Sequence, residues 1–246
     1  EGDGHMPKQQ GVDTAESTAA VTAEPSSDRA ESGEPDVENG APPEESTQER
    51  ILRVAAEVFA RKGYHGTGVA ELGDAAGLKR GALYYHIGSK EDLLYNLSKR
   101  HVEEALARGK RVVESDLHPI DKLRALAREH VQTIAARRDE VTVVLREQHA
   151  LSGTRARALS KLRHQHQDLF AQVLQEGVDA GVFRSADSVT VLGVLGLFNW
   201  TYVWFDHAKG PLTPEQVADK LTDLVLYGQL VPPSRKSNGK SESATR

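Results

Sequence analysis

The sequence of 246 residues contains no cysteine, and this absence excludes several kinds of site. Without thiols the chain has no disulfide bond, no thiol nucleophile and no cysteine-ligated metal. Long apolar runs are missing too: the nearest candidate, residues 192–205, is interrupted by Asn199 and Thr201 and falls short of the about 18 residues of a membrane span. The amino-terminal residues are acidic and lack the apolar core of a signal peptide. We therefore expect a cytoplasmic protein with no membrane partner.

Patterns that carry enzyme chemistry are also absent. The sequence shows no glycine-rich phosphate loop and no paired-carboxylate signature. His164 and His166 are two positions apart on a predicted helix, so their side chains point apart, which argues against a metal ion shared with His149. These absences predict that the protein is not an enzyme, has no catalytic residues and uses no metal or cofactor.

The net charge of −5 is distributed unevenly along the chain. Residues 1–46 contain 12 acidic and 2 basic residues, a net charge of −10, which leaves +5 for the remainder. Residues 47–90 contain 7 basic and 4 acidic residues. This segment can approach the phosphates of a nucleic acid, whereas the acidic leader cannot.

Both ends of the chain have the composition of disordered segments. Residues 1–45 are rich in Glu, Ser, Ala, Pro and Gly and form an acidic leader, of which residues 1–5 resemble a remnant of recombinant expression. Residues 232–246 begin with two prolines and form a polar, basic tail. The folded part is therefore expected between residues 46 and 231.

The strongest motif lies at residues 66–93. An apolar stripe with spacings of three and four predicts a short helix that ends at Gly77, where a left-handed residue can turn the chain. A second short helix at 79–85 carries basic and aromatic side chains around the apolar Leu83. Ser89 is placed to cap a third helix. Two short helices joined by a glycine turn, the second of them basic and aromatic, predict a helix-turn-helix that binds DNA.

These residues resemble the DNA-binding signature of TetR-family transcriptional regulators. The agreeing positions are Gly66-Thr67, Val69, Leu72, Ala75-Ala76-Gly77-Leu78, Gly81, Leu83-Tyr84-Tyr85-His86 and Ser89-Lys90-Glu91. Apolar periodicity predicts about nine helices and no sheet. The resemblance implies an all-α fold, with an N-terminal three-helix helix-turn-helix domain at 46–93 that binds double-stranded DNA. A helical ligand-binding and dimerisation domain would follow at 94–231.

The resemblance also implies the residues that contact DNA: Thr67, Gly68, Lys79, Arg80, Gly81, Ala82, Tyr84, Tyr85, His86 and Lys90. Arg80 is the candidate for a guanine contact, because its guanidinium group can span O6 and N7. Tyr84, Tyr85 and His86 are expected on phosphates or sugars, and Thr67 and Lys90 on phosphates near helix amino ends. Lys79 and Gly68 depart from the hydroxyl residues usual in the family. The alternatives are packing against the first helix for Tyr84, a structural loop residue for His86 and a solvated charge for Arg80.

The sequence outside this motif predicts mostly longer helices. Their expected ranges are 46–62, 89–114, 119–137, a shorter helix from Asp139, 154–180, 187–207 and 213–230. On the helix at 187–207, Phe198, Tyr202 and Phe205 share one face, and Trp200, Trp204 and His207 share another. One face is expected in the interior and the other in a homodimer interface, with Gly193 and Gly196 permitting a close helix crossing.

The stretches 200–204 and 210–216 resemble those of actinobacterial TetR regulators of steroid and fatty-acid breakdown, which respond to acyl-coenzyme A thioesters. This resemblance implies a small-molecule effector, an acyl-coenzyme A or another hydrophobic compound. It makes Arg146, Gln148, His149, Trp200 and Trp204 candidate ligand-binding residues, with a surface or core role as the alternative for each. The predicted function is a ligand-released repressor that binds a palindromic operator as a dimer. The alternative is a small-molecule-binding helical protein with a weak or vestigial DNA-binding head.

Overall fold

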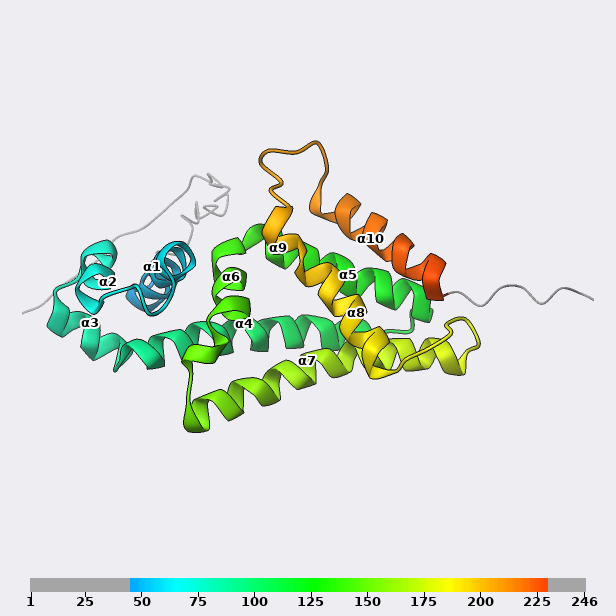
Figure 1. Ribbon diagram of the computed structural model, residues 1–246, viewed down its shortest axis with the longest axis horizontal. Coiled ribbons are helices and arrows are strands. Elements are labelled where there is room, and N and C mark those ends of the chain that lie inside the picture. The colour runs from blue at the N-terminus through cyan, green and yellow to red at the C-terminus, as the bar shows by residue number, and fades with distance from the viewer. Residues whose placement is uncertain (1–44, 230–246) are drawn as a thin grey trace, which may run out of the picture. The chain divides into compact units, whose positions relative to one another are not determined.

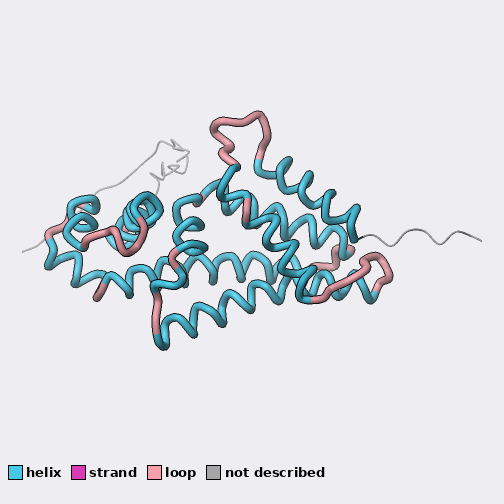
Figure 2. The backbone as a smooth tube through the Cα atoms, viewed as in Figure 1, coloured by secondary structure: helices cyan, strands magenta, loops and turns pink. Residues whose placement is uncertain are grey.

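The structure is a computed structural model that describes residues 45–229 (Figure 1). The predicted leader, apart from Glu45, and the predicted tail lie outside the described residues. Within residues 45–229 the chain forms ten α-helices and one 3-10 turn, and it forms no strand (Figure 2). Nine of the helices have eight residues or more. The prediction of an all-α fold with about nine helices is confirmed.

The first three helices form the head: α1 (Thr47–Lys62), α2 (Val69–Ala76) and α3 (Arg80–Ile87). The start of α1 is a reciprocal capping box, in which the Ser46 hydroxyl accepts from the Glu49 amide and the Glu49 carboxylate accepts from the Ser46 amide. Phe59 on α1 and Leu83 on α3 are completely buried. Helix α2 packs against α1, and α3 packs against α2 and the following helix, with Phe59 and Leu83 in one apolar cluster.

The remaining helices form the body. They are α4 (Lys90–Val113), α5 (Pro119–Ala136), α6 (Arg138–Arg146), α7 (Gly153–Asp179), α8 (Ser188–Asn199), α9 (Thr201–Trp204) and α10 (Pro214–Gln229), with the 3-10 turn η1 (Gln148–Ala150) before α7. Helix α4 packs against α5, α6 and α7, and α10 packs along α5. Helix α1 of the head packs against α6, so the head contacts the body at a second place besides the α3–α4 connection.

The predicted helix at 187–207 is wrong in its extent, because the chain forms two helices there. Helix α8 ends at Asn199, and the short α9 ends at Trp204. The buried hydroxyl of Thr201 donates to the Phe198 carbonyl oxygen at 2.7 Å, a local side-chain bond that competes with the helical ladder. Phe205 then takes an extended conformation and is buried.

Two apolar clusters fill the interior. One contains the head residues and extends through Leu97 and Val102 to Val143, Leu151 and Leu159 of the body. The other lies among α4, α5, α7, α8 and α10. Because the first cluster includes residues of α1, α4, α6 and α7, the position of the head depends on how the body helices pack. None of the helices in residues 45–229 is long and apolar enough to cross a membrane.

Candidate DNA interface and ligand cavity

The turn between α2 and α3 has the geometry that a helix-turn-helix needs. Gly77 has φ 68° and ψ 30°, a left-handed conformation that favours glycine, and it caps α2. The Leu78 amide donates to the Gly73 carbonyl oxygen at 2.8 Å. A Cβ on Gly73 would lie 2.9 Å from the Leu78 carbonyl oxygen, so this position also requires glycine. The sequence motif did not reveal Gly73, because its requirement comes from a contact across the turn.

Helix α3 presents one face to the surface. Leu83 and Ile87 are buried, whereas the predicted DNA-binding residues of this helix and its cap are exposed; these are Lys79, Arg80, Gly81, Ala82, Tyr84, Tyr85 and His86. Tyr85 is 87% exposed, and its ring contacts that of His86 with centroids 5.3 Å apart. The Arg80 guanidinium lies 5.6 Å from the centroid of the Tyr84 ring. Lys79 occupies the cap position of α3 without a side-chain cap bond, as its departure from serine predicts.

Gly68 is exposed as well, at the cap position of α2. It forms no side-chain cap, and the space where its Cβ would lie is empty to 4 Å. A ligand backbone could therefore approach this end of α2 closely.

Thr67 and Lys90, the other two predicted DNA-binding residues, form hydrogen bonds within the head. Thr67 is 2% exposed, and its hydroxyl donates to the Gly63 carbonyl oxygen at 2.8 Å. The Lys90 ammonium donates to the carbonyl oxygens of Tyr64 and Thr67, both at 2.9 Å. Both side chains are engaged by hydrogen bonds within the head, and these bonds compete with the predicted phosphate contacts.

The body encloses a cavity of about 430 Å³ between α4, α5, α6, α7 and α8. Its apolar wall includes Leu126, Ile134, Val141, Val144, Phe170 and Leu195. Its polar wall includes His101, Arg108, Glu129, His130, Thr133, Arg163, His166, Gln167 and Asn199. Such a mixture of apolar surface and a few polar groups is typical of a small-molecule site.

None of the five predicted ligand-binding residues lines this cavity. Helix α6 ends before the 3-10 turn that carries Gln148 and His149, and Arg146 packs over the Tyr202 ring at 5.5 Å from its centroid. Trp200 is 61% exposed after the break between α8 and α9, and Trp204 lines a separate surface hollow with Arg138 and Leu212.

Two half-buried histidines lie together in the cavity wall. The rings of His130 and His166 stack with centroids 5.6 Å apart, and His130 Nε2 lies 2.8 Å from Asn199 Oδ1. Burial lowers the pKa of His130 to about 4 and that of His166 to about 3. Both rings are therefore neutral near pH 7. A histidine inside an otherwise apolar helical stripe was the sequence signal that could have located this cavity.

The two histidines do not form a metal site with their neighbours. His164 is exposed and bonds to the carbonyl oxygen of Ser160, one turn earlier on α7. Among residues 45–229 no group of three or more His, Asp or Glu side chains is placed to hold a metal ion.

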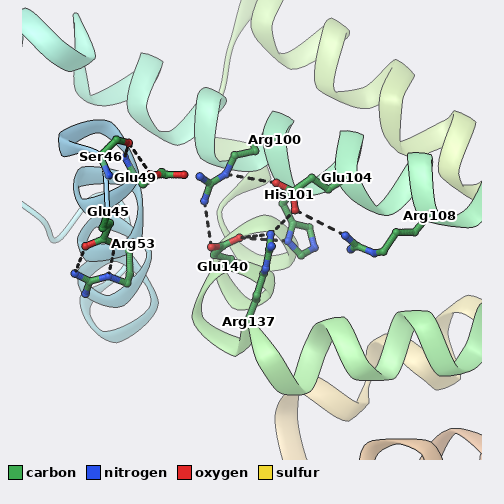
Figure 3. A network of polar contacts seen from close by, with 10 residues as sticks. All are labelled: Glu45, Ser46, Glu49, Arg53, Arg100, His101, Glu104, Arg108, Arg137 and Glu140. Atoms are coloured by element: carbon green, nitrogen blue, oxygen red, sulfur yellow. Dashed lines mark hydrogen bonds and ion pairs between the residues drawn. The ribbon is translucent and has the colours of Figure 1, made fainter. Parts of the chain in front are cut away.

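A network of charges runs from the cavity wall toward the head (Figure 3). The Glu140 carboxylate lies 3.4 Å from an Arg100 nitrogen, 3.8 Å from Arg137 Nη1 and 3.6 Å from His101 Nδ1. Burial alone would raise the pKa of Glu140, but these three neighbours bring it below its ordinary value. Glu104 pairs with Arg137 and lies 3.8 Å from Arg108 Nη1. Since His101 and Arg108 line the cavity, the network connects that wall to Arg100.

Arg100 extends this connection to the start of α1. Hydrogen bonds from Ser46 lower the pKa of Glu49, and the positive charge of Arg100 adds to this effect. Figure 3 shows Arg100 between α1 and the Glu140 carboxylate. Arg100 therefore lies between the charges of the cavity wall, to which its ion pairs connect it, and the amino end of α1, where its charge acts on Glu49.

Comparisons with known proteins agree with this arrangement. The family model for bacterial regulatory proteins of the tetR family matches residues 51–97, and the model for the tetracyclin repressor-like C-terminal domain matches residues 116–229. The HTH-type transcriptional repressor KstR2 of Rhodococcus jostii (strain RHA1) is 30% identical over 184 residues, which cover 74% of this chain and 90% of the relative. The chain belongs to the TetR family. It is a helix-turn-helix transcriptional regulator of that family.

Solved structures of TetR regulators share the fold. PfmR from Thermus thermophilus is 34% identical, with a TM-score of 0.67, and the match covers 72% of this chain and 97% of PfmR. AibR, solved in complex with isovaleryl coenzyme A and operator DNA, is 26% identical with a TM-score of 0.66, and the match covers 73% of this chain and 97% of AibR. The TetR fold thus accounts for nearly the whole length of both neighbours.

Proposed function

We propose that this TetR regulator is a homodimeric repressor that binds a palindromic operator and is released by a small molecule in the body cavity. In this proposal residues 46–93 bind DNA and residues 94–231 bind the effector and the second subunit. Two α3 helices set about 34–36 Å apart would enter successive major grooves. Arg80 would contact a guanine, Lys79, Tyr84, Tyr85 and His86 would contact the backbone, and Gly68, Gly81 and Ala82 would allow close approach.

The exposed apolar side chains of α8 and α10 support the homodimer. Val189, Trp200, Leu224 and Tyr227 are more than half exposed although all are large and apolar or aromatic. The two helices contact each other within one chain, and Gly193 and Gly196 leave open space beside α8. Large apolar side chains exposed on neighbouring helices favour association, and a two-fold pairing would bring the α8–α10 faces of two subunits together.

The effector we propose is an acyl-coenzyme A thioester or another hydrophobic small molecule. The cavity has the size and mixed polarity of a ligand site, and the related AibR was solved with isovaleryl coenzyme A. The observation that carries the proposal is the continuity of α4, which begins under α3 and supplies His101, Val102, Ala105 and Arg108 to the cavity wall. An effector that binds better to a conformation with wrongly spaced heads shifts the population away from the DNA-binding form.

The test is a mobility-shift titration against the upstream region of the protein's own gene at two salt concentrations. Arg80→Ala is compared with Arg111→Ala, which removes an exposed arginine at the far end of α4. We expect a discrete wild-type complex, a loss of about 1–3 kcal/mol for Arg80→Ala, and no change for Arg111→Ala. Equal binding by all three proteins, and only at low salt, would instead indicate a vestigial head on a small-molecule-binding protein.

Release is tested in the same assay by adding acyl-coenzyme A thioesters. Dissociation of the wild-type complex at micromolar thioester supports the effector proposal. Persistence of the complex with every thioester of two to sixteen carbons rejects this class of effector while leaving the operator binding intact.

A further inference from the structure

Arg163 is a cation of the cavity wall that forms no ion pair within residues 45–229. Helix α7 directs Ser160, Arg163, His166, Gln167 and Phe170 to the cavity, at spacings that keep them on one side of the helix. Among residues 45–229, Arg163 makes no ion pair and no hydrogen bond, and burial lowers the pKa of its guanidinium group. Arg108, the other arginine of the wall, lies 3.4 Å from a Glu129 oxygen and donates to Thr133 Oγ1 at 3.0 Å.

An unpaired guanidinium group that is half-buried destabilises the folded protein. Removal of a charge from water is unfavourable unless a partner compensates for it. The neighbouring His130 and His166 offer no negative charge, because both rings are neutral near pH 7. A charged group kept in a cleft without a partner is a candidate for ligand recognition.

The position of Arg163 along α7 places it near the cavity mouth. Ser160 and His164 also line the cavity and are exposed, so this turn of α7 borders solvent. Phe170, two turns further on, is buried beside the apolar wall. The cavity thus has a positive charge near its entrance, and its interior is lined by apolar side chains such as Phe170 beside the neutral ring of His166.

We propose that Arg163 binds the anionic group of an amphipathic effector, a carboxylate or a phosphate, at the mouth of the cavity while the apolar part of the effector fills the interior. This inference rests on the proposed function, in which the cavity holds the effector. A free carboxylic acid and the phosphates of a coenzyme A thioester share this chemistry. A planar guanidinium group suits either anion, because it can donate two parallel hydrogen bonds.

Calorimetric titration of the full-length protein separates these sources. The probes are octanoate, octanoyl-coenzyme A and the uncharged octanoyl thioester of N-acetylcysteamine. The proteins are the wild type, Arg163→Gln and the control Arg157→Gln, which removes an exposed arginine of α7 that does not line the cavity. We expect at least one anionic probe to bind the wild type and the control equally, and to bind Arg163→Gln about 10- to 100-fold more weakly.

The uncharged thioester should bind all three proteins with the same affinity. If Arg163→Gln loses affinity for octanoate, Arg163 binds the carboxylate. If it loses affinity only for octanoyl-coenzyme A, Arg163 binds the phosphates. Equal affinity of the wild type and Arg163→Gln for both anions overturns the proposal. So does the failure of both anions to bind the wild type.

Thermal unfolding without ligand provides the second readout. Since no side chain among the described residues pairs with Arg163, Arg163→Gln should unfold at the same temperature as the wild type or at a higher one. A lower unfolding temperature together with unchanged anion affinity would show a structural role and would overturn the proposal.

The operator assay keeps this inference distinct from the proposed function. If octanoyl-coenzyme A releases the wild type and Arg163→Gln from DNA equally well, the assignment of Arg163 fails and ligand release stands. If an anion binds through Arg163 but leaves the operator complex intact, the assignment stands and ligand release by that anion fails.

Discussion

The ammonium group of Lys90 lies 4.3 Å from the centroid of the Tyr64 ring and donates to the Tyr64 carbonyl oxygen at 2.9 Å. A second bond of 2.9 Å to the Thr67 carbonyl oxygen ties the first turn of α4 to the loop before α2. Lys90 thus fixes the loop on which the helix-turn-helix is mounted. Lys90 agrees with the DNA-binding signature, but its ammonium group here forms hydrogen bonds inside the head.

Lys90→Met tests this brace, because it keeps the alkyl chain and removes the three N–H donors. We expect the free energy of unfolding to fall by about 1–3 kcal/mol, since two part-buried carbonyl oxygens lose the ammonium donor and the Tyr64 oxygen keeps only the Thr67 amide. Operator affinity should fall with it, while the slope of log affinity against log salt stays unchanged. The matched control, Lys79→Met, removes an exposed charge from the cap of α3 and should reduce that slope by about 1 per subunit without changing stability. A reduced salt slope for Lys90→Met would instead support a contact between Lys90 and a DNA phosphate.

Tyr85→Phe tests the exposed face of α3. The ring of Tyr85 is 87% exposed and its hydroxyl group forms no bond to residues 45–229, so the variant should unfold like the wild type. If the hydroxyl donates to a phosphate, affinity should fall by about 1–3 kcal/mol for every DNA sequence alike. Tyr227→Phe, at 82% exposure on α10, is the control: it removes a hydroxyl group outside the head but keeps the ring that the proposed dimer surface uses, so it should bind DNA normally. If both variants change DNA affinity equally, the Tyr85 hydroxyl group does not contact DNA.

Lys122→Met tests a buried ion pair in the body. Lys122 is 8% exposed, and its ammonium donates to the Val113 carbonyl oxygen at 2.7 Å and to the Glu176 carboxylate at 2.8 Å. Removing the donor leaves the carbonyl group at the end of α4 without this bond, so we expect a loss of about 2 kcal/mol in urea unfolding. Lys110→Met, an exposed lysine on α4, should change stability by less than about 0.5 kcal/mol. A loss no larger for Lys122→Met than for Lys110→Met would show that the pair contributes nothing net.

The buried histidines predict a loss of stability in mild acid. Burial lowers the folded-state pKa of His130 to about 4 and that of His166 to about 3, against an ordinary value of 6.5. Unfolded chains bind these protons from pH 6.5 downward and folded chains do not, so stability is complete above pH 6.5 and declines as pH falls toward the folded-state values. Each histidine contributes up to about 1.4 kcal/mol per pH unit in that range.

His166→Gln should therefore flatten the decline between about pH 6.5 and about pH 4. The measurement is urea unfolding at fixed protein concentration, because dimerisation also stabilises the folded state. His207→Gln removes an exposed histidine and should leave the slope unchanged. If the unfolding free energies of the wild type and His166→Gln fall in parallel with pH, His166 does not cause the loss of stability in acid.

Local features of the fold were predictable because their causes lie within a few residues. Ser46 with Glu49 and Thr213 with Gln216 form the capping pairs that their spacing predicts. Gly77 takes the left-handed conformation that ends α2. The break at Asn199 was missed, because the apolar and aromatic run from 187 to 207 contains no proline to mark it.

The sequence by itself determined the all-helical class, the helix-turn-helix and the exposed face of α3, because helix periodicity, caps and turn glycines act over three or four residues. Only the tertiary structure decided which side chains meet across helices. In the structure Thr67 and Lys90 form hydrogen bonds within the head. His130, His166 and Arg163 line the cavity, whereas the five predicted ligand-binding residues do not; these are Arg146, Gln148, His149, Trp200 and Trp204. Cavity walls and buried charges depend on the packing of five helices far apart in the chain, and no local pattern records that packing.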